Sequence, residues 1–142
     1  MAYQLKAAER NIRLSLETPG HLPPVFADIA LTERVFQNLL DNAFKFTPDG
    51  GNISIHLSQQ HAGVRVQVVD SGIGIAPEDQ PYIFERYKQI SKHDMAKKGM
   101  GIGLAIVKKI LELHQTSIKV DSELGKGAAF IFVLPVVGKL AM

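Results

Sequence analysis

The segment Phe36–Gly51, FQNLLDNAFKFTPDGG, contains the pattern that decides the fold. From Leu31 onward the apolar residues recur with the period of an amphipathic helix, and Pro48 predicts where that helix ends. Asp28 or Thr32 is the expected N-cap, because either side chain can accept a hydrogen bond from a free backbone N–H of the first turn. The apolar residues share one broad face, as packing against a core requires: Val35, Phe36, Leu39, Leu40 and Ala43.

The opposite side of this helix carries a polar stripe. Asn38 and Asn42 are four residues apart and Lys45 follows three residues later, so the two amides and the ammonium point in a similar direction. Arg34 extends the stripe toward the start of the helix. A solvated surface is the ordinary explanation of such a stripe. Asparagine is a mediocre helix former, however, so two of them inside a helix also point to a ligand.

The composition is that of one globular domain, and it excludes several kinds of site. A chain of 142 residues can bury a substantial core. A formal net charge of +2, without a cluster of basic and aromatic residues, argues against nucleic-acid binding. The sequence has no cysteine, which excludes disulfides, thiolate zinc sites and cysteine nucleophiles. No apolar run approaches the roughly 18–20 residues of a membrane span, so we expect a cytoplasmic fragment that makes no membrane contact and is monomeric in isolation.

Alternating polar and apolar residues predict five strands, at Asn11–Thr18, Asn52–Ser58, Val64–Val69, Ser117–Asp121 and Ala128–Leu134. A second helix is expected after Gly99. Residues 1–9 are too short for an independent helix, and we interpret them as the stub of a preceding linker helix, with the domain itself at 10–142. Because the hairpins are local, the predicted class is α+β, with helices on one face of a largely antiparallel sheet.

The stretch 76–98 has little regular pattern, and a long irregular segment inside a domain is often a functional lid. We expect it to be mobile except where Ile83, Phe84 and Tyr87 anchor it. Two glycine motifs flank it: Asp70-x-Gly72-x-Gly74 before it, and Gly99-x-Gly101-x-Gly103 after it. Glycine allows close backbone approach, and a helix N-terminus attracts anions, so the second motif predicts a phosphate contact. Neither motif is specific when taken alone.

In this order the motifs resemble the ATP-binding catalytic domain of bacterial sensor histidine kinases, part of an ATPase superfamily with gyrase, gyrase-like heat-shock chaperones and MutL. NLLDNAFKFTPDGG resembles the N box, DSGIGI the G1 box, IFERYKQ the F box and GMGIGLAIVKKI the G2 box. The resemblance covers Asn11 to Pro135. It implies the Bergerat fold, an α/β sandwich in which helices cover one face of a mixed, mostly antiparallel sheet.

The resemblance also implies roles for individual residues. Asn42 would coordinate Mg²⁺ with help from Asn38, Lys45 would approach the phosphates, and Asp70 would accept a hydrogen bond from the adenine amino group. Phe46 either stacks on the base or belongs to the core, and spacing alone does not separate these readings. Arg86 is the candidate lid residue for the triphosphate. The remaining expected nucleotide contacts are Gly72, Gly74, Ile75, Tyr87, Lys98, Gly99, Gly101, Gly103 and Leu104.

Two features of the sequence bear on whether this chain can hydrolyse ATP or phosphorylate itself: the residue at position 38 and the lack of a phosphoacceptor histidine motif. The hydrolytic branches of the superfamily carry a glutamate one helical turn before the metal-binding asparagine, whereas this chain has Asn38, whose amide cannot accept a proton from water. No histidine lies in a phosphoacceptor motif. The resemblance therefore implies a catalytic domain that presents ATP to a histidine on a separate helical-hairpin domain of a homodimeric parent kinase, with a response regulator downstream. The alternatives are a slow stand-alone ATPase and a nucleotide-binding module without chemistry.

Overall fold

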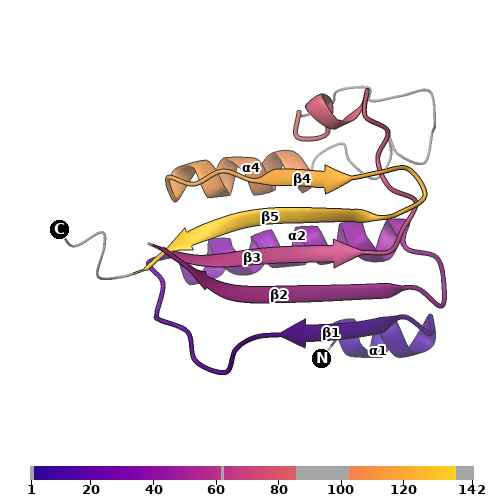
Figure 1. The fold of residues 1–142 in the computed structure, drawn as a ribbon, viewed down its shortest axis with the longest axis horizontal. Helices are drawn as coiled ribbons and strands as arrows, with labels where there is room; N and C mark the ends of the chain where they lie inside the picture. The colour runs from indigo at the N-terminus through magenta and orange to yellow at the C-terminus, as the bar shows by residue number, and fades with distance from the viewer. Residues whose placement is uncertain (1, 62, 86–102, 137–142) are drawn as a thin grey trace.

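The computed structural model describes residues 2–61, 63–85 and 103–136, and Figure 1 shows their arrangement. The elements in chain order are α1 (Ala2–Glu9), β1 (Arg13–Glu17), α2 (Ile29–Phe46), β2 (Asn52–Gln60), β3 (Gly63–Asp70), the 3₁₀ turn η1 (Gln80–Tyr82), α4 (Gly103–Leu113), β4 (Lys119–Ser122) and β5 (Ala128–Pro135). All five predicted strands form, with ends that differ by a few residues. The division into a linker stub at 1–9 and a domain at 10–142 stays a prediction.

The strands form one mixed sheet in the order β1-β2-β3-β5-β4. β1 runs parallel to β2, and the other three neighbouring pairs are antiparallel. α2 and α4 cover the same face of this sheet (Figure 1). The predicted α+β class, with helices on one face of a mostly antiparallel sheet, is confirmed.

The core lies between the two helices and the covered face. In β3, alternate side chains point inward, and Val64, Val66 and Val68 are buried there together with Asp70. The predicted apolar face of α2 packs into the core. Its residues Val35, Leu39 and Ala43 are almost fully buried. The face predicted from helical periodicity is therefore the one that packs.

The ends of α2 are set by specific hydrogen bonds. Asp28 is the N-cap, and its carboxylate accepts a hydrogen bond from the Leu31 N–H at 2.8 Å, which decides between the two predicted caps. The helix begins at Ile29, two residues before the predicted start. At the other end the Arg10 guanidinium donates to the carbonyls of Phe44 and Thr47, which satisfies acceptors that a helix terminus leaves free.

The first part of the predicted lid is anchored to the core. Ile83 has no exposed surface, and the Phe84 ring makes an edge contact with Phe130 at a centroid distance of 6.2 Å. Ala76 and Asp79 are also buried, whereas the other side of the segment from Ala76 to Glu85 is exposed, so the segment packs on the core at these positions only. The rest of the lid, together with the predicted anchor Tyr87, lies outside the described residues.

Candidate functional site

Several predicted site residues lie at one end of the sheet. Figure 1 shows the C-terminal part of α2, the end of β3, the turn between β4 and β5, and the start of α4 all at this end. The two helices contribute side chains, and the loops contribute glycines. Residues that are distant in sequence therefore share one region because each of these elements starts or stops there.

A cavity of about 100 Å³ lies between α2 and the start of α4. It brings together five of the predicted residues and one that the sequence analysis missed: Asn38, Asn42, Lys45, Gly103, Leu104 and Asp41. Asp41 could have been identified by its spacing, because it is three residues after Asn38 and directly before Asn42. Two asparagines, an aspartate and a lysine are thus among the residues that line one cavity.

Burial of Asn42 differs from the expectation of a solvated polar stripe. Only 7% of Asn42 is exposed, because α4 packs over this side of α2. Its Oδ1 atom and the Nδ2 atom of Asn38 are buried and have no hydrogen-bond partner within the described part of the chain. Buried polar atoms are normally satisfied, so each of these atoms indicates a missing partner.

The two unpaired atoms have opposite requirements. Oδ1 of Asn42 is an acceptor and fits a cation that prefers oxygen ligands, as Mg²⁺ does. Nδ2 of Asn38 is a donor and fits an anionic oxygen, and Lys45 adds a positive charge to the same cavity. The donor set therefore fits a divalent cation carried by a phosphate, with Asn42 on the cation and Asn38 on the phosphate side. The sequence analysis had placed both amides on the metal.

Asp70 is the buried charge of the site. It is 7% exposed and occupies the inward face at the end of β3. Its Oδ1 accepts a hydrogen bond from the Gly72 N–H at 2.8 Å. Burial raises the pKa of Asp70, while backbone hydrogen bonds from Gly72 and Ala128 lower it in part. A carboxylate held in this way can accept a hydrogen bond from a bound ligand.

The loop after Asp70 requires glycine for reasons of space and backbone conformation. A Cβ atom on Gly72 would lie 2.4 Å from the Phe46 carbonyl oxygen. Gly74 has a φ of +77°, and a Cβ there would lie 2.0 Å from the Glu123 carbonyl oxygen. The Ile73 N–H also donates to the Phe46 carbonyl at 3.3 Å. The loop is therefore pressed against the end of α2, which places Asp70 beside the helix that carries Asn42.

Three apolar residues from the predicted nucleotide set belong to the core. Phe46 is 7% exposed and packs in the main hydrophobic cluster, which favours the core reading over base stacking. Ile75 and Leu104 are buried in the same cluster. Phe46 and Ile75 can support the site from the core side, whereas Leu104 also lines the cavity.

Five of the predicted site residues cannot be placed, and one buried polar residue near the site was not predicted. Arg86, Tyr87, Lys98, Gly99 and Gly101 lie outside the described residues. A residue that the sequence analysis missed is Thr47, whose buried Oγ1 also has no partner within the described residues. It directly follows α2 and precedes Pro48, a position at which threonine reads as a helix end.

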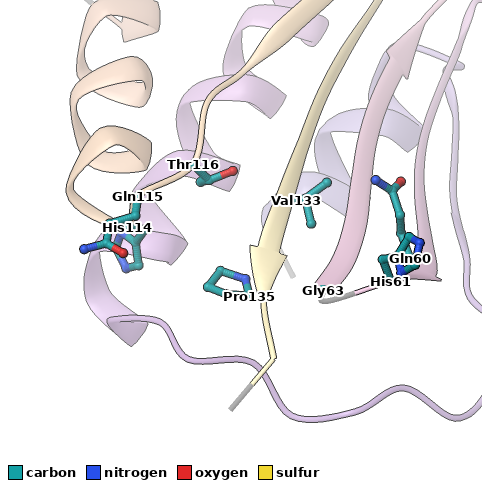
Figure 2. A pocket seen from close by; sticks show the side chains of 8 residues that line it. All are labelled: Gln60, His61, Gly63, His114, Gln115, Thr116, Val133 and Pro135. Carbon is teal, nitrogen blue, oxygen red and sulfur yellow. The ribbon is translucent and has the colours of Figure 1, made fainter. Parts of the chain in front are cut away.

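A second cavity, of about 340 Å³, lies at the other end of the sheet (Figure 2). Its lining contains none of the predicted site residues: Gln60, His61, Gly63, His114, Gln115, Thr116, Val133 and Pro135. His114 has both ring nitrogens engaged, with Nδ1 at 2.9 Å from the Ile110 carbonyl and Nε2 accepting from the Asp28 N–H at 2.9 Å. This histidine therefore ties the end of α4 to the start of α2.

Across residues 2–61, 63–85 and 103–136, no group of three histidine, cysteine or acidic side chains could hold a metal by itself. No helix in those ranges combines the length and apolar character needed to cross a bilayer. Any cation at the Asn42 cavity would accordingly depend on few protein ligands and on oxygens from its own ligand, as is usual for Mg²⁺ with nucleotides.

A family model and the similar proteins of known name point to the same family. A family model described as "Histidine kinase-, DNA gyrase B-, and HSP90-like ATPase" matches residues 27–138. The adaptive-response sensory kinase SasA of Gloeothece citriformis (strain PCC 7424) is 41% identical over 129 residues, which are 90% of this chain and 33% of that protein. The chain thus spans about a third of the length of this relative.

Solved structures agree with this match. The nucleotide-free catalytic domain of the histidine kinase ThkA has a TM-score of 0.81 and 31% identity, with 95% of this chain and 86% of that chain covered. Full-length ShkA in complex with AMPPNP has a TM-score of 0.80 and 31% identity, with 95% of this chain and 29% of that chain covered.

Proposed function

The chain belongs to the family of histidine kinase-, DNA gyrase B- and HSP90-like ATPases, and we propose that it binds Mg·ATP and presents the γ-phosphate to a histidine on a separate domain. Its fold is the α/β Bergerat fold of histidine kinase catalytic domains. The kinase chemistry belongs to a longer parent protein, in which this chain is the ATP-binding part. The proposed partners are a phosphoacceptor helical hairpin of the same homodimeric kinase and, after it, a response regulator.

The observation that carries the proposal is the pair of unpaired buried amide atoms at Asn42 and Asn38, in one cavity with Lys45. An acceptor for a cation, a donor for an anion and an ammonium that has no ion-pair partner in the described parts of the chain together match the Mg²⁺–phosphate part of a nucleotide. Mg²⁺ bound there would neutralise phosphate charge. The side chains of the chain itself then position the phosphates, which is most of what phosphoryl transfer requires.

We assign Asp70 to recognition of adenine. An ionised carboxylate accepts hydrogen bonds only, so it selects a ring edge that carries an amino group. Guanine has a carbonyl at the equivalent position and would leave a buried charge facing an acceptor. The fixed orientation of Asp70, through Gly72, supports this assignment because it places one oxygen in a defined direction.

The same geometry argues against efficient hydrolysis by this chain alone. Asn38 lies one helical turn before Asn42, where a catalytic base would stand, and an amide cannot remove a proton from water. His114 is engaged through both nitrogens with backbone groups and is not available as an acceptor of phosphate. Bound ATP would be oriented but would have no attacking group from the described residues.

The test is a calorimetric and labelling experiment on the chain as it stands. We expect Mg·ATP and Mg·ADP to bind with clear preference over Mg·GTP, and little self-labelling or turnover with γ-labelled ATP. Addition of a helical-hairpin domain with its acceptor histidine should restore labelling on that histidine. Equal affinity for GTP would contradict the adenine assignment. Robust hydrolysis that is lost on Asn42→Ala would instead favour a stand-alone ATPase.

A further inference from the structure

Asp41 lies between two parts of the structure that have separate roles. Asp41 is one of the residues that line the cavity, together with Asn38, Asn42 and Lys45. Its Oδ1 accepts a hydrogen bond from the Tyr3 hydroxyl of α1 at 3.0 Å. One residue therefore connects the N-terminal helix with the cavity assigned to the phosphates.

Asp41 and Lys45 are spaced to form an ion pair within α2. An acid four residues before a base is the favourable orientation for such a pair on a helix. Both side chains are exposed, yet Lys45 forms no ion pair with any residue in the described parts of the chain. The carboxylate that would be its nearest helical partner is bound to Tyr3 instead.

The Tyr3 hydroxyl is held in place by the packing of α1 on α2. Its ring stacks on Phe44 with a centroid distance of 6.0 Å and an interplanar angle of 18°. The hydroxyl has a second, longer contact with the Gln37 carbonyl at 3.4 Å, and Lys6 lies over the Phe44 ring at 5.4 Å from its centroid. The position of the hydroxyl thus depends on the contacts that Tyr3 and Lys6 of α1 make with α2.

We propose that Tyr3 is a positioning residue that holds Asp41 away from Lys45, so that the docking of α1 determines whether the Lys45 ammonium is available to an anionic ligand. This inference rests on the proposed function for its ligand, the phosphate chain of ATP. When α1 is docked, Asp41 is bound to Tyr3, and Lys45 has no ion-pair partner among residues 2–61, 63–85 and 103–136. When the Tyr3 contact is lost, Asp41 pairs with Lys45 and neutralises the ammonium that would otherwise meet the anionic ligand.

The protonation of Tyr3 agrees with the same contact. Burial, the hydrogen bond to Asp41 and the charge of that carboxylate raise the pKa of Tyr3 to about 12, so the hydroxyl keeps its proton and remains a donor under ordinary conditions. Movement of α1 or removal of the hydroxyl would therefore release Asp41. Tyr3→Phe removes the donor while it keeps the ring that stacks on Phe44.

The experiment is a double-mutant cycle on the intact chain with Tyr3→Phe, Asp41→Asn and the double variant. Tyr3→Phe should weaken Mg·ATP about two- to fourfold at low salt, the size expected for a solvent-exposed charge pair, and high salt should reduce the effect. Adenosine, which has no phosphate, should bind the variant and the parent equally. Adding Tyr3→Phe to Asp41→Asn should change nothing further, because no carboxylate remains to move. Leu5→Ala, an exposed position on α1, is the matched control and should leave both affinities unchanged.

A second measurement tests the inference without nucleotide. The rate at which an amine-acylating reagent modifies Lys45, read by mass spectrometry, should fall in Tyr3→Phe and recover in the double variant. Unchanged Lys45 reactivity in Tyr3→Phe would overturn the inference. An equal loss of ATP affinity with and without the Asp41 carboxylate would also overturn it, since the effect would then be a general result of loosened packing. Failure of the parent chain to bind Mg·ATP would refute the proposed function, whereas the Lys45 reactivity would still test the contact.

Discussion

The Gly72 N–H donates a hydrogen bond of 2.8 Å to Oδ1 of Asp70, so one oxygen of this buried carboxylate is fixed by the loop that follows it. A second backbone hydrogen bond, from Ala128, also stabilises the ionised form. Burial nevertheless prevails and raises the pKa of Asp70 above its usual range. The folded protein therefore holds a charge whose burial is unfavourable, which is expected at a site that exists to bind a ligand.

Asp70→Asn should separate stability from binding. The amide oxygen can still accept from Gly72, and the buried charge is removed, so the free energy of unfolding near neutral pH should stay the same or rise by up to about 1 kcal/mol. Affinity for adenine nucleotides should fall about 10- to 100-fold, because a hydrogen bond to a charged group is lost. Urea denaturation and calorimetry check the two halves. A variant that unfolds much more easily than the parent would assign Asp70 a structural role.

The raised pKa of Asp70 also predicts a pH dependence. Because the folded pKa lies above the ordinary value of 3.8, the contribution of Asp70 to stability is fully present below the ordinary pKa and is lost as the pH rises through the folded pKa. Binding has the opposite sign, since adenine needs the ionised acceptor. Adenosine affinity should therefore decrease as the pH falls through the folded pKa. Asp70→Asn is the control and should bind weakly at every pH.

Gly72→Ala should destabilise the protein by about 1–3 kcal/mol, because the new Cβ would lie 2.4 Å from the Phe46 carbonyl oxygen and the loop must move. Gly103→Ala is the matched control. At the start of α4 the nearest side-chain atom to a new Cβ is Asn38 Cγ at 4.0 Å, and alanine is the better helix former, so stability should be unchanged or increased. Comparable losses in the two variants, measured in urea, would contradict the assigned reason.

Asn42→Ala should remove the effect of Mg²⁺ on ATP binding at little cost to the empty protein. Oδ1 of Asn42 has no partner within the described residues, so its removal breaks no hydrogen bond there, and the free energy of unfolding should change by no more than about 1 kcal/mol. Leu39→Ala, one helical turn earlier and 1% exposed, should cost about 2–5 kcal/mol. If the two variants lose similar stability without ligand, Asn42 is structural and the metal assignment fails.

The raised pKa of Tyr3 predicts how the stability of the protein changes at high pH. Its pKa is raised from 10.0 to about 12, so its contribution to stability is fully present below pH 10 and is lost as the pH rises through about 12. The difference in free energy of unfolding between the parent and Tyr3→Phe should therefore shift in favour of the variant across this range. In Asp41→Asn the tyrosinate absorbance of Tyr3 should develop at lower pH than in the parent. An identical titration in both proteins would show that Asp41 does not hold the hydroxyl.

Many of the helices and strands could be predicted from the local pattern of polar and apolar residues. The alternation in Asn52–Ser58 and Val64–Val69 predicted a hairpin, and β2 and β3 form it with the register Ile55 opposite Val68. Such predictions succeed because the period of side-chain direction is a property of the backbone itself. The start of the strand predicted at Ser117–Asp121 was less well placed, since β4 begins only at Lys119, where pairing with β5 starts.

The sequence by itself determined the helix of the asparagine stripe, the hairpins, the glycine loops and the order of motifs that identifies the family. Only the tertiary structure decided that Asn42 is buried, that Phe46 belongs to the core and that the Tyr3 hydroxyl donates a hydrogen bond to the Asp41 carboxylate. Periodicity shows which side chains share a face, but not what covers that face. α4 packs over Asn42, and α1 lies 38 residues before the carboxylate it contacts, so these facts depend on contacts between elements that no local pattern encodes.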